Sequence, residues 1–174
     1  MRSTRWAGEP DPRAAPIRDI PGYTAGIVSI DIPTPEAINE FFAREFPSAH
    51  ASGYRCIETG RGFVVTRWRY DKATLRPGGF ISGPMQFGLA DVALWFLTFT
   101  VLGLAPMAVT SEMYIAFLRP AIGGDLLARA ELLRAGKTAI KGTVRLWVDG
   151  APDKPVSHAT GSYVQIGSNV TAGA

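Results

Sequence analysis

The sequence predicts a single α+β domain in which an antiparallel sheet of about six strands wraps around one long apolar helix. Residues 84–102 are almost wholly apolar and end at Gly103, whereas six other segments alternate between apolar and polar residues, as half-buried strands do. The chain has 174 residues, of which 47% are hydrophobic and 19% are charged. It is therefore long and apolar enough to bury one core without disulfides or metals.

The charge and the content of cysteine and histidine narrow the classes of function. The net charge of +3 comes from scattered Lys and Arg residues, which is not the footprint of a nucleic-acid-binding protein. Cys56 is the single cysteine, so no intrachain disulfide can form and a reducing cytoplasm is expected. His50 and His158 are too few for a histidine-built metal site, and no zinc-ligand spacing is present. We expect no metal and no cofactor.

The two ends of the chain are predicted to lie outside the domain. Residues 1–23 are rich in Pro, Arg and Gly and contain no apolar signal core, which predicts a poorly ordered N-terminal tail. The domain is predicted to span residues 24–166, and residues 167–174 form a C-terminal tail.

A short amphipathic helix at about residues 34–46 is predicted near the start of the domain. Thr34 suits the N-cap, Pro35 suits the first helical position, and Pro47 ends the helix. The apolar residues between these ends recur at helical spacing: Ala37, Ile38, Phe41 and Phe42.

Strands are predicted on both sides of the long helix. Two precede it, at residues 54–59 and 63–70, joined by a glycine-containing turn. Four follow it, at residues 109–117, 126–134, 138–148 and 155–166. Because the links between the last four strands are short, we expect these strands to pair antiparallel.

The long apolar helix has two interpretations. The twenty residues from Pro84 to Gly103 would extend roughly 30 Å, enough to cross a bilayer. Asp91 near the middle would cost about 2.5–3.5 kcal/mol on membrane insertion. The alternating strands also need an apolar element to cover one face. We therefore favour a buried core helix over a membrane anchor.

Asp91 is the residue of this helix that needs an explanation. It lies two turns inside the helix, so it cannot act as the N-cap, and its helical neighbours cannot neutralise it. One explanation is structural: the carboxylate bonds a strand backbone or pairs with an arginine such as Arg67 or Arg119. The other is catalytic, and the residues before the helix favour it.

The segment Ser82-Gly83-Pro84 places backbone N–H groups at the start of a helix, where the helix dipole favours negative charge. Such donors form the oxyanion hole of acyl-transfer enzymes, although any glycine-rich turn before a helix is similar. Gly83 and Asp91 are eight residues apart, roughly 12 Å along one helix. They cannot both reach one carbonyl group, so a catalytic site would combine Gly83 of one subunit with Asp91 of another. The catalytic hypothesis therefore predicts an oligomer.

Two stretches resemble a known family. Residues 76–91, Arg-Pro-Gly-Gly-Phe-Ile-Ser-Gly-Pro-Met-Gln-Phe-Gly-Leu-Ala-Asp, resemble the signature of PaaI-like (phenylacetyl-CoA thioesterase-like) hotdog proteins. Residues 108–120, Ala-Val-Thr-Ser-Glu-Met-Tyr-Ile-Ala-Phe-Leu-Arg-Pro, are similar to the strand that follows the central helix there. The likeness covers roughly residues 50–166 and implies the hotdog fold.

The resemblance also implies an acyl-CoA thioesterase that works as a homodimer or a dimer of dimers. Asp91 matches the aspartate that activates water or attacks the thioester carbonyl. Gly83 matches the glycine whose N–H polarises that carbonyl, and Thr110 matches a hydroxyl that assists the water. Ser82 stands where many members have histidine and can still donate one hydrogen bond. A small or medium acyl-CoA is the expected substrate, and non-catalytic acyl-CoA binding is the alternative.

Further residues are expected to bind the substrate. Arg76 occupies an upstream position that carries Asn or Gln in the family, and Gln86 lies in the same motif. Arg119, Arg134 and Lys137 are candidates to hold the phosphates of coenzyme A, with solvated surface charge as the alternative.

Three other chemistries fit the sequence less well. A nucleophilic dyad of Cys56 with a histidine is disfavoured because Cys56 alternates within a predicted strand, as an inert core cysteine does. The glycine-rich loop lacks the Gly-Lys-Ser/Thr ending of a nucleotide-binding loop. A dehydratase of this fold would need a catalytic histidine, and neither histidine lies near that loop in the sequence.

Overall fold

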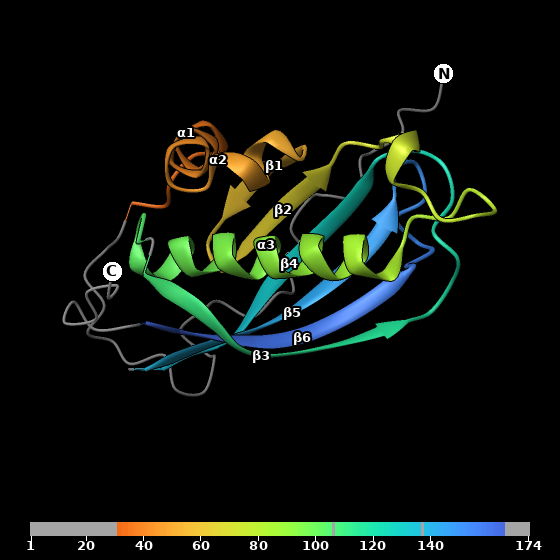
Figure 1. The fold of residues 1–174 in the computed structure, drawn as a ribbon. Coiled ribbons are helices and arrows are strands. Elements are labelled where there is room, and N and C mark those ends of the chain that lie inside the picture. The colour runs from red at the N-terminus through yellow and green to blue at the C-terminus, as the bar shows by residue number, and fades with distance from the viewer. Residues whose placement is uncertain (1–30, 106, 137, 166–174) are drawn as a thin grey trace, which may run out of the picture.

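A six-stranded antiparallel sheet curves around one side of a long helix in the computed structural model, which describes residues 31–105, 107–136 and 138–165 (Figure 1). The predicted α+β fold class is confirmed, whereas the two predicted tails lie outside the described residues. The helices are α1 (Pro35–Glu45), α2 (Pro47–Ala51) and α3 (Gly83–Leu102), with a 3₁₀ turn at Lys72–Thr74. The strands are β1 (Tyr54–Gly60), β2 (Phe63–Trp68), β3 (Ala108–Phe117), β4 (Leu126–Ala135), β5 (Ala139–Val148) and β6 (Ser157–Gln165).

The sheet has the strand order β1-β2-β4-β5-β6-β3, and every neighbouring pair is antiparallel. The antiparallel pairing expected within β4, β5 and β6 is confirmed. β3 does not pair with β4, its successor in the sequence; it pairs with β6 at the far edge. The reason is that residues 118–125 return the chain across the end of the sheet, where Gly123 and Gly124 adopt positive φ angles of 65° and 83°.

Helix α3 begins one residue earlier than its apolar run predicts. Gly83 is its first residue and Ser82 its N-cap, whose Oγ accepts a hydrogen bond from the Met85 N–H at 3.4 Å. Gly103 ends the helix with a φ of 72°, a conformation that glycine adopts without strain.

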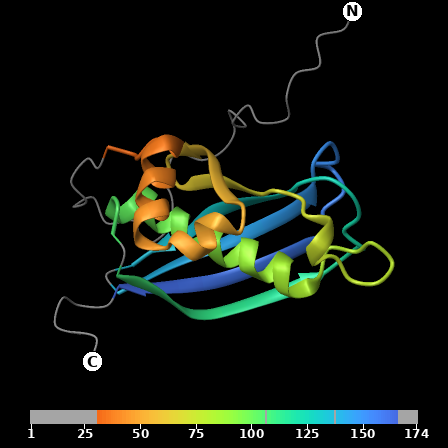
Figure 2. The same cartoon turned by 45° about the horizontal axis from the view of Figure 1, so that its top comes forward.

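The sheet and α1 together bury α3, which lies across the concave face of the sheet (Figures 1 and 2). Its mean hydropathy of 1.5 is high enough for a membrane span, but 72% of its most apolar window is buried inside the domain. On the side away from the sheet, Phe41 and Phe42 of α1 pack edge-on against Phe96 and Phe99 of α3, with centroids 5.1–5.4 Å apart. The core-helix interpretation is therefore the correct one.

The predicted helix at residues 34–46 is present as α1. Thr34 caps it, since its Oγ1 accepts a hydrogen bond from the Ala37 N–H at 3.3 Å. α1 ends just before Pro47, as predicted, and Pro47 also begins α2. The missing N–H of proline is tolerated in the first turn of a helix, so the same residue that stops α1 can start α2.

Two glycines allow the sheet to approach α3 closely. A Cβ atom on Gly142 of β5 would lie 2.6 Å from Leu97 Cδ2, and one on Gly161 of β6 would lie 2.8 Å from Leu94 Cδ1. The Cβ of Gly161 would also lie 2.9 Å from the Glu112 carbonyl oxygen of β3. Because a backbone atom cannot move aside as a side chain can, Gly161 fixes the spacing between β6 and β3.

We expect Gly161→Ala to lower the free energy of unfolding by about 1–3 kcal/mol, the usual cost of overpacking a core. Thr160→Ala, at the adjacent outward-facing position, is the matched control and should change it by less than about 0.5 kcal/mol. Urea unfolding curves of the two variants provide the comparison. Equal free energies of unfolding for the two variants would show that β6 and β3 can move apart to accept a side chain at position 161.

Candidate functional site

Among the described residues, the partners of the Asp91 carboxylate are hydroxyl groups and not a cation. Its Oδ1 accepts hydrogen bonds from Thr110 Oγ1 at 2.7 Å and from the Tyr163 hydroxyl at 2.8 Å. The two arginines considered as partners are engaged elsewhere: Arg67 Nε lies 3.7 Å from Asp125 Oδ2, and Arg119 donates to the Pro155 carbonyl at 2.8 Å. Neither of these two arginines therefore pairs with Asp91.

Three elements bring these groups together. Asp91 lies in the middle of α3, while Thr110 and Tyr163 face each other across the β3–β6 pair. A bulge between Thr110 and Glu112 interrupts this pair, so the register changes directly after the threonine. The sequence predicts Asp91 and Thr110 as site residues but does not point to Tyr163. The available signal was the alternation of β6, which places Tyr163 on the same inward face as Ala159 and Gly161.

Asp91 lines a pocket of about 260 Å³. Phe46, Val92 and Trp95 form apolar walls, and the first residues of β3 complete the rim together with Tyr163. A carboxylate at the edge of an apolar hollow of this size has room for a water molecule and for part of an organic substrate.

Gly83 lines a second and larger pocket, of about 520 Å³. Phe80, Phe117 and Leu118 supply its apolar part, and all three are more than one-third exposed. Within the described residues the Gly83 N–H makes no hydrogen bond, Pro84 has no N–H, and the Met85 N–H is taken by Ser82. The start of α3 thus offers one free backbone donor, at Gly83, to an anion or a polarised carbonyl.

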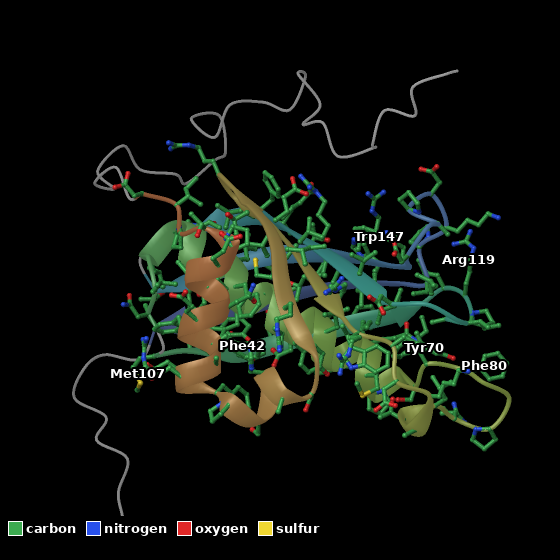
Figure 3. The ribbon with its side chains drawn as sticks, turned by 90° about the horizontal axis from the view of Figure 1, so that it is seen from above. Phe42, Tyr70, Phe80, Met107, Arg119 and Trp147 are labelled. Carbon is green, nitrogen blue, oxygen red and sulfur yellow. The ribbon has the colours of Figure 1, made fainter. Side chains whose placement is uncertain are left out.

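Three of the expected substrate-binding residues lie around this second pocket: Arg76, Gln86 and Arg119. Gln86 is buried; its Nε2 donates to the Ile81 carbonyl at 3.2 Å, and its Oε1 is buried without a partner among the described residues. Arg76 is exposed and belongs to the loop that leads into α3. Figure 3 shows Phe80 and Arg119 at one end of the molecule and Met107, next to the start of β3, at the other.

The remaining candidates are not brought to Gly83 within one subunit. Arg134 is exposed near the end of β4, beside Ala135, which packs on Val101 at the opposite end of α3. Val101 is eighteen residues from Gly83, roughly 27 Å along the helix. Lys137 lies outside the described residues. Ser82 has a structural role as the N-cap of α3.

Neither histidine forms a nucleophilic dyad with Cys56. His158 is exposed on the outer face of the sheet, where its Nε2 lies 2.7 Å from Thr143 Oγ1. Cys56 is 2% exposed on the inner face, and its thiol contacts the Glu58 carbonyl at 3.6 Å. Burial raises the pKa of the Cys56 thiol to about 12, which leaves it protonated at neutral pH. Among the residues that the structure covers, no cluster of His, Cys, Asp or Glu could hold a metal ion.

Comparison with known proteins identifies the family. The model of the Thioesterase superfamily matches residues 78–152, which include the start of α3, Asp91, Thr110 and the β4–β5 hairpin. Residues 78–152 thus form a thioesterase superfamily domain. Its fold is the PaaI-like hotdog fold, and its enzyme class is that of the thioester hydrolases. No curated protein sequence matches the chain.

Solved structures resemble this thioesterase over most of its length. A candidate thioesterase from Silicibacter sp. TM1040 is 28% identical with a TM-score of 0.70, and the match covers 82% of this chain and 97% of that one. The PaaI protein from the phenylacetic acid degradation operon of E. coli is 26% identical with a TM-score of 0.64, covering 75% and 92%. A thioesterase from Haemophilus influenzae, 19% identical with a TM-score of 0.67, covers 78% and 92% and shares the fold alone.

We expect the thiol of Cys56 to have no part in the thioesterase reaction. A rise of its pKa from 9.0 to about 12 lowers the thiolate fraction by about a thousandfold, in addition to the steric protection of burial. Native protein at pH 8 should resist alkylation by iodoacetamide, whereas protein in urea should react fully. Cys56→Ala should retain the turnover of wild type; a large loss without unfolding would contradict this expectation.

Proposed function

We propose that this thioesterase hydrolyses a small or medium acyl-CoA, with Asp91 as the catalytic carboxylate and Gly83 as the oxyanion donor. The observation that carries the proposal is the carboxylate of Asp91, which has two hydroxyl donors, no cationic partner among the described residues, and a place at the rim of an apolar pocket. An unpaired carboxylate beside a substrate-sized hollow is suited to general-base or nucleophilic catalysis.

In the general-base form of the mechanism, the Asp91 carboxylate takes a proton from a water molecule as its oxygen attacks the thioester carbonyl. The carbonyl oxygen gains negative charge, and the N–H of Gly83 at the positive end of α3 stabilises it. The tetrahedral intermediate collapses, the C–S bond breaks, and the coenzyme A thiolate receives the proton from Asp91. In the nucleophilic form, Asp91 itself attacks the carbonyl, the C–S bond breaks, and the coenzyme A thiolate leaves and takes a proton from water. Water then hydrolyses the resulting anhydride and regenerates the Asp91 carboxylate.

The two catalytic groups lie in different pockets of one subunit, so we infer that the active site is shared between two subunits. Asp91 lies eight residues beyond Gly83 on the same helix, roughly 12 Å along its axis. Neither group lines the pocket of the other. A second copy of the chain is the simplest source of the missing half in each case.

The free edge of β3 supports a specific arrangement of that second copy. Within the described residues β3 pairs with β6 on one side only, and several of its side chains are well exposed: Val109 40%, Tyr114 71% and Phe117 55%. An unprotected edge strand is a template for pairing with another chain. Two copies of β3 that pair antiparallel about a two-fold axis would continue the sheet across the dimer.

This pairing would bring the two half-sites together. With the axis near Met113, in the middle of β3, Val109 lies opposite Phe117 of the partner subunit. Val109 lines the Asp91 pocket, and Phe117 packs on Gly83, where a Cβ atom would lie 3.2 Å from its ring. The geometry of one subunit therefore supports a site with Asp91 from one chain and Gly83 from the other.

The Gly83 pocket is the proposed position of coenzyme A. Arg76 and Arg119 are the cations of its rim, suited to the phosphates of the nucleotide, and Gln86 lies deeper. We propose that Arg134 and Lys137 of the partner subunit bind the phosphates of coenzyme A, because Arg134 lies at the opposite end of α3 from Gly83 in the same subunit.

We expect Asp91→Asn to lower kcat by about 10²–10⁴-fold, the usual contribution of a general base. The amide oxygen can still accept the hydrogen bonds of Thr110 and Tyr163, so the fold should persist. Release of free thiol from short, medium, long and aryl acyl-CoAs, measured for the wild type and for the variant, checks this. Wild-type protein that binds acyl-CoA but releases no thiol would indicate a non-catalytic acyl-CoA-binding protein.

Mixed dimers test the shared site directly. Gly83→Pro removes the N–H at a helical position that accepts proline, and Ser82 already has the extended backbone (φ −68°, ψ 156°) required before proline. Gly83→Ala keeps the N–H while making the same contact with Phe117, and is the control.

When Asp91→Asn and Gly83→Pro subunits carry different tags and are co-purified, each mixed dimer should have one intact site and about half of the wild-type activity. Homodimers of Asp91→Asn and of Gly83→Pro should be nearly inactive. Inactive mixed dimers, with Gly83→Ala homodimers active, would show that both groups act within one subunit.

A further inference from the structure

Tyr163 is a buried polar group that the mechanism above leaves without a role. Its side chain is 5% exposed, and its hydroxyl lies 2.8 Å from Asp91 Oδ1 and 3.0 Å from the Asp91 carbonyl oxygen. Both acceptors belong to the same residue, so the phenol points at the catalytic carboxylate and its backbone at once. A tyrosine placed only to fill the core would not require this geometry.

The two carboxylate oxygens of Asp91 differ in their hydrogen-bond partners. Thr110 Oγ1 and the Tyr163 hydroxyl both approach Oδ1, at 2.7 and 2.8 Å, whereas Oδ2 has no hydrogen-bond partner among the described residues. A carboxylate oxygen with two short donors is well satisfied. The unoccupied acceptor capacity of the carboxylate therefore resides on Oδ2.

We propose that Tyr163 is a positioning residue of the active site, which with Thr110 anchors Oδ1 of Asp91 and so leaves Oδ2 as the oxygen that acts on water. The inference rests on the proposed function and adds to it the identity of the working oxygen and the residue that selects it. Tyr163 acts through Asp91 and does not itself contact the reacting atoms.

The protonation state of Tyr163 agrees with this role. Burial, and next the negative charge of Asp91, raise the pKa of the Tyr163 hydroxyl, so it stays protonated and remains a donor throughout the working range of an enzyme. The other tyrosine that senses the charge of Asp91 is Tyr54 of β1, whose pKa is raised by burial and next by Asp91. No hydrogen bond joins Tyr54 to Asp91 in the described part of the chain.

The same geometry revises the role expected for Thr110. Its hydroxyl has a single proton, and the 2.7 Å contact directs that proton to Asp91 Oδ1. Thr110 can then accept a hydrogen bond from the attacking water but cannot donate one to it. Thr110 and Tyr163 are thus a pair of donors to the same carboxylate oxygen, and they lie opposite each other on β3 and β6.

Tyr163→Phe tests the proposal, because it removes the hydroxyl and keeps the ring. We expect kcat with the best acyl-CoA to fall by roughly 10–100-fold, as for a misplaced catalytic group, with KM within about twofold of the wild-type value. Tyr54→Phe is the matched control: this buried tyrosine also packs on α3, at Gly88, and its hydroxyl does not hold the carboxylate. It should retain the wild-type kcat.

A coupled measurement separates positioning from simple stabilisation. If Thr110 and Tyr163 hold the same oxygen, then the loss of kcat in Thr110→Val/Tyr163→Phe should differ from the product of the two single losses. Rates are taken below the unfolding temperature of each variant, which a melting curve provides. Unchanged kcat in folded Tyr163→Phe, or equal losses in Tyr163→Phe and Tyr54→Phe, would overturn the proposal.

Failure of this inference is distinct from failure of the proposed function. If Asp91→Asn abolishes turnover while Tyr163→Phe does not, Asp91 remains the catalytic carboxylate and Tyr163 is structural only. If the wild-type protein hydrolyses no acyl-CoA, the proposed function itself fails, and the role of Tyr163 fails with it.

Discussion

The whole fold depends on covering a helix that is apolar on every side. α3 has no polar stripe to present to water, so one packing partner would leave much of its surface exposed. The sheet therefore curves around it, and α1 covers the remaining side with Phe41 and Phe42. Glycines at positions 142 and 161 let the strands come close enough to complete the burial. Each of these features follows from the composition of a single helix.

Asp91 is the one ionisable residue of that helix, and it is partly buried. A buried carboxylate is costly unless it is hydrogen-bonded, and pairing it with an arginine would satisfy it but reduce its basicity. Two hydroxyls satisfy it without neutralising it. The structure thus leaves Oδ2 of this carboxylate without a partner among the described residues, at the rim of a pocket, where both proposed forms of thioester hydrolysis use it.

The proposed division of the active site between two subunits follows from the rigidity of the same helix. One end of α3 presents the free N–H of Gly83 and its middle presents Asp91, and a helix cannot bend to bring them together. β3 runs beside both pockets: Val109 and Thr110 line the first, and Phe117 lines the second. A strand that connects the two half-sites and keeps an open edge is well placed to build complete sites by pairing with its own copy.

Much of this was predictable from the order of residues. The period of the apolar pattern separates helix from strand, and Thr34, Ser82 and Gly103 mark helix ends through local chemistry that requires no tertiary contact. Asp91 is conspicuous in the sequence because it interrupts an apolar run, and the eight residues between it and Gly83 already imply two half-sites. Pro47 illustrates the limit of such local rules, since proline can end one helix and begin the next with equal ease.

What only the tertiary structure decided is how segments distant in the sequence meet. The pairing of β3 with β6, and not with β4, places Thr110 opposite Tyr163, and their contact with Asp91 depends on the curvature of the sheet around α3. The packing of Ala135 on Val101 likewise places Arg134 at the far end of α3 from Gly83. The sequence by itself determined the ends of the helices and the candidate residues Asp91, Gly83 and Thr110, because residue type and local spacing are properties of the chain. Which oxygen of Asp91 is held, and by which residues, was decided by long-range packing, which leaves no local pattern in the sequence.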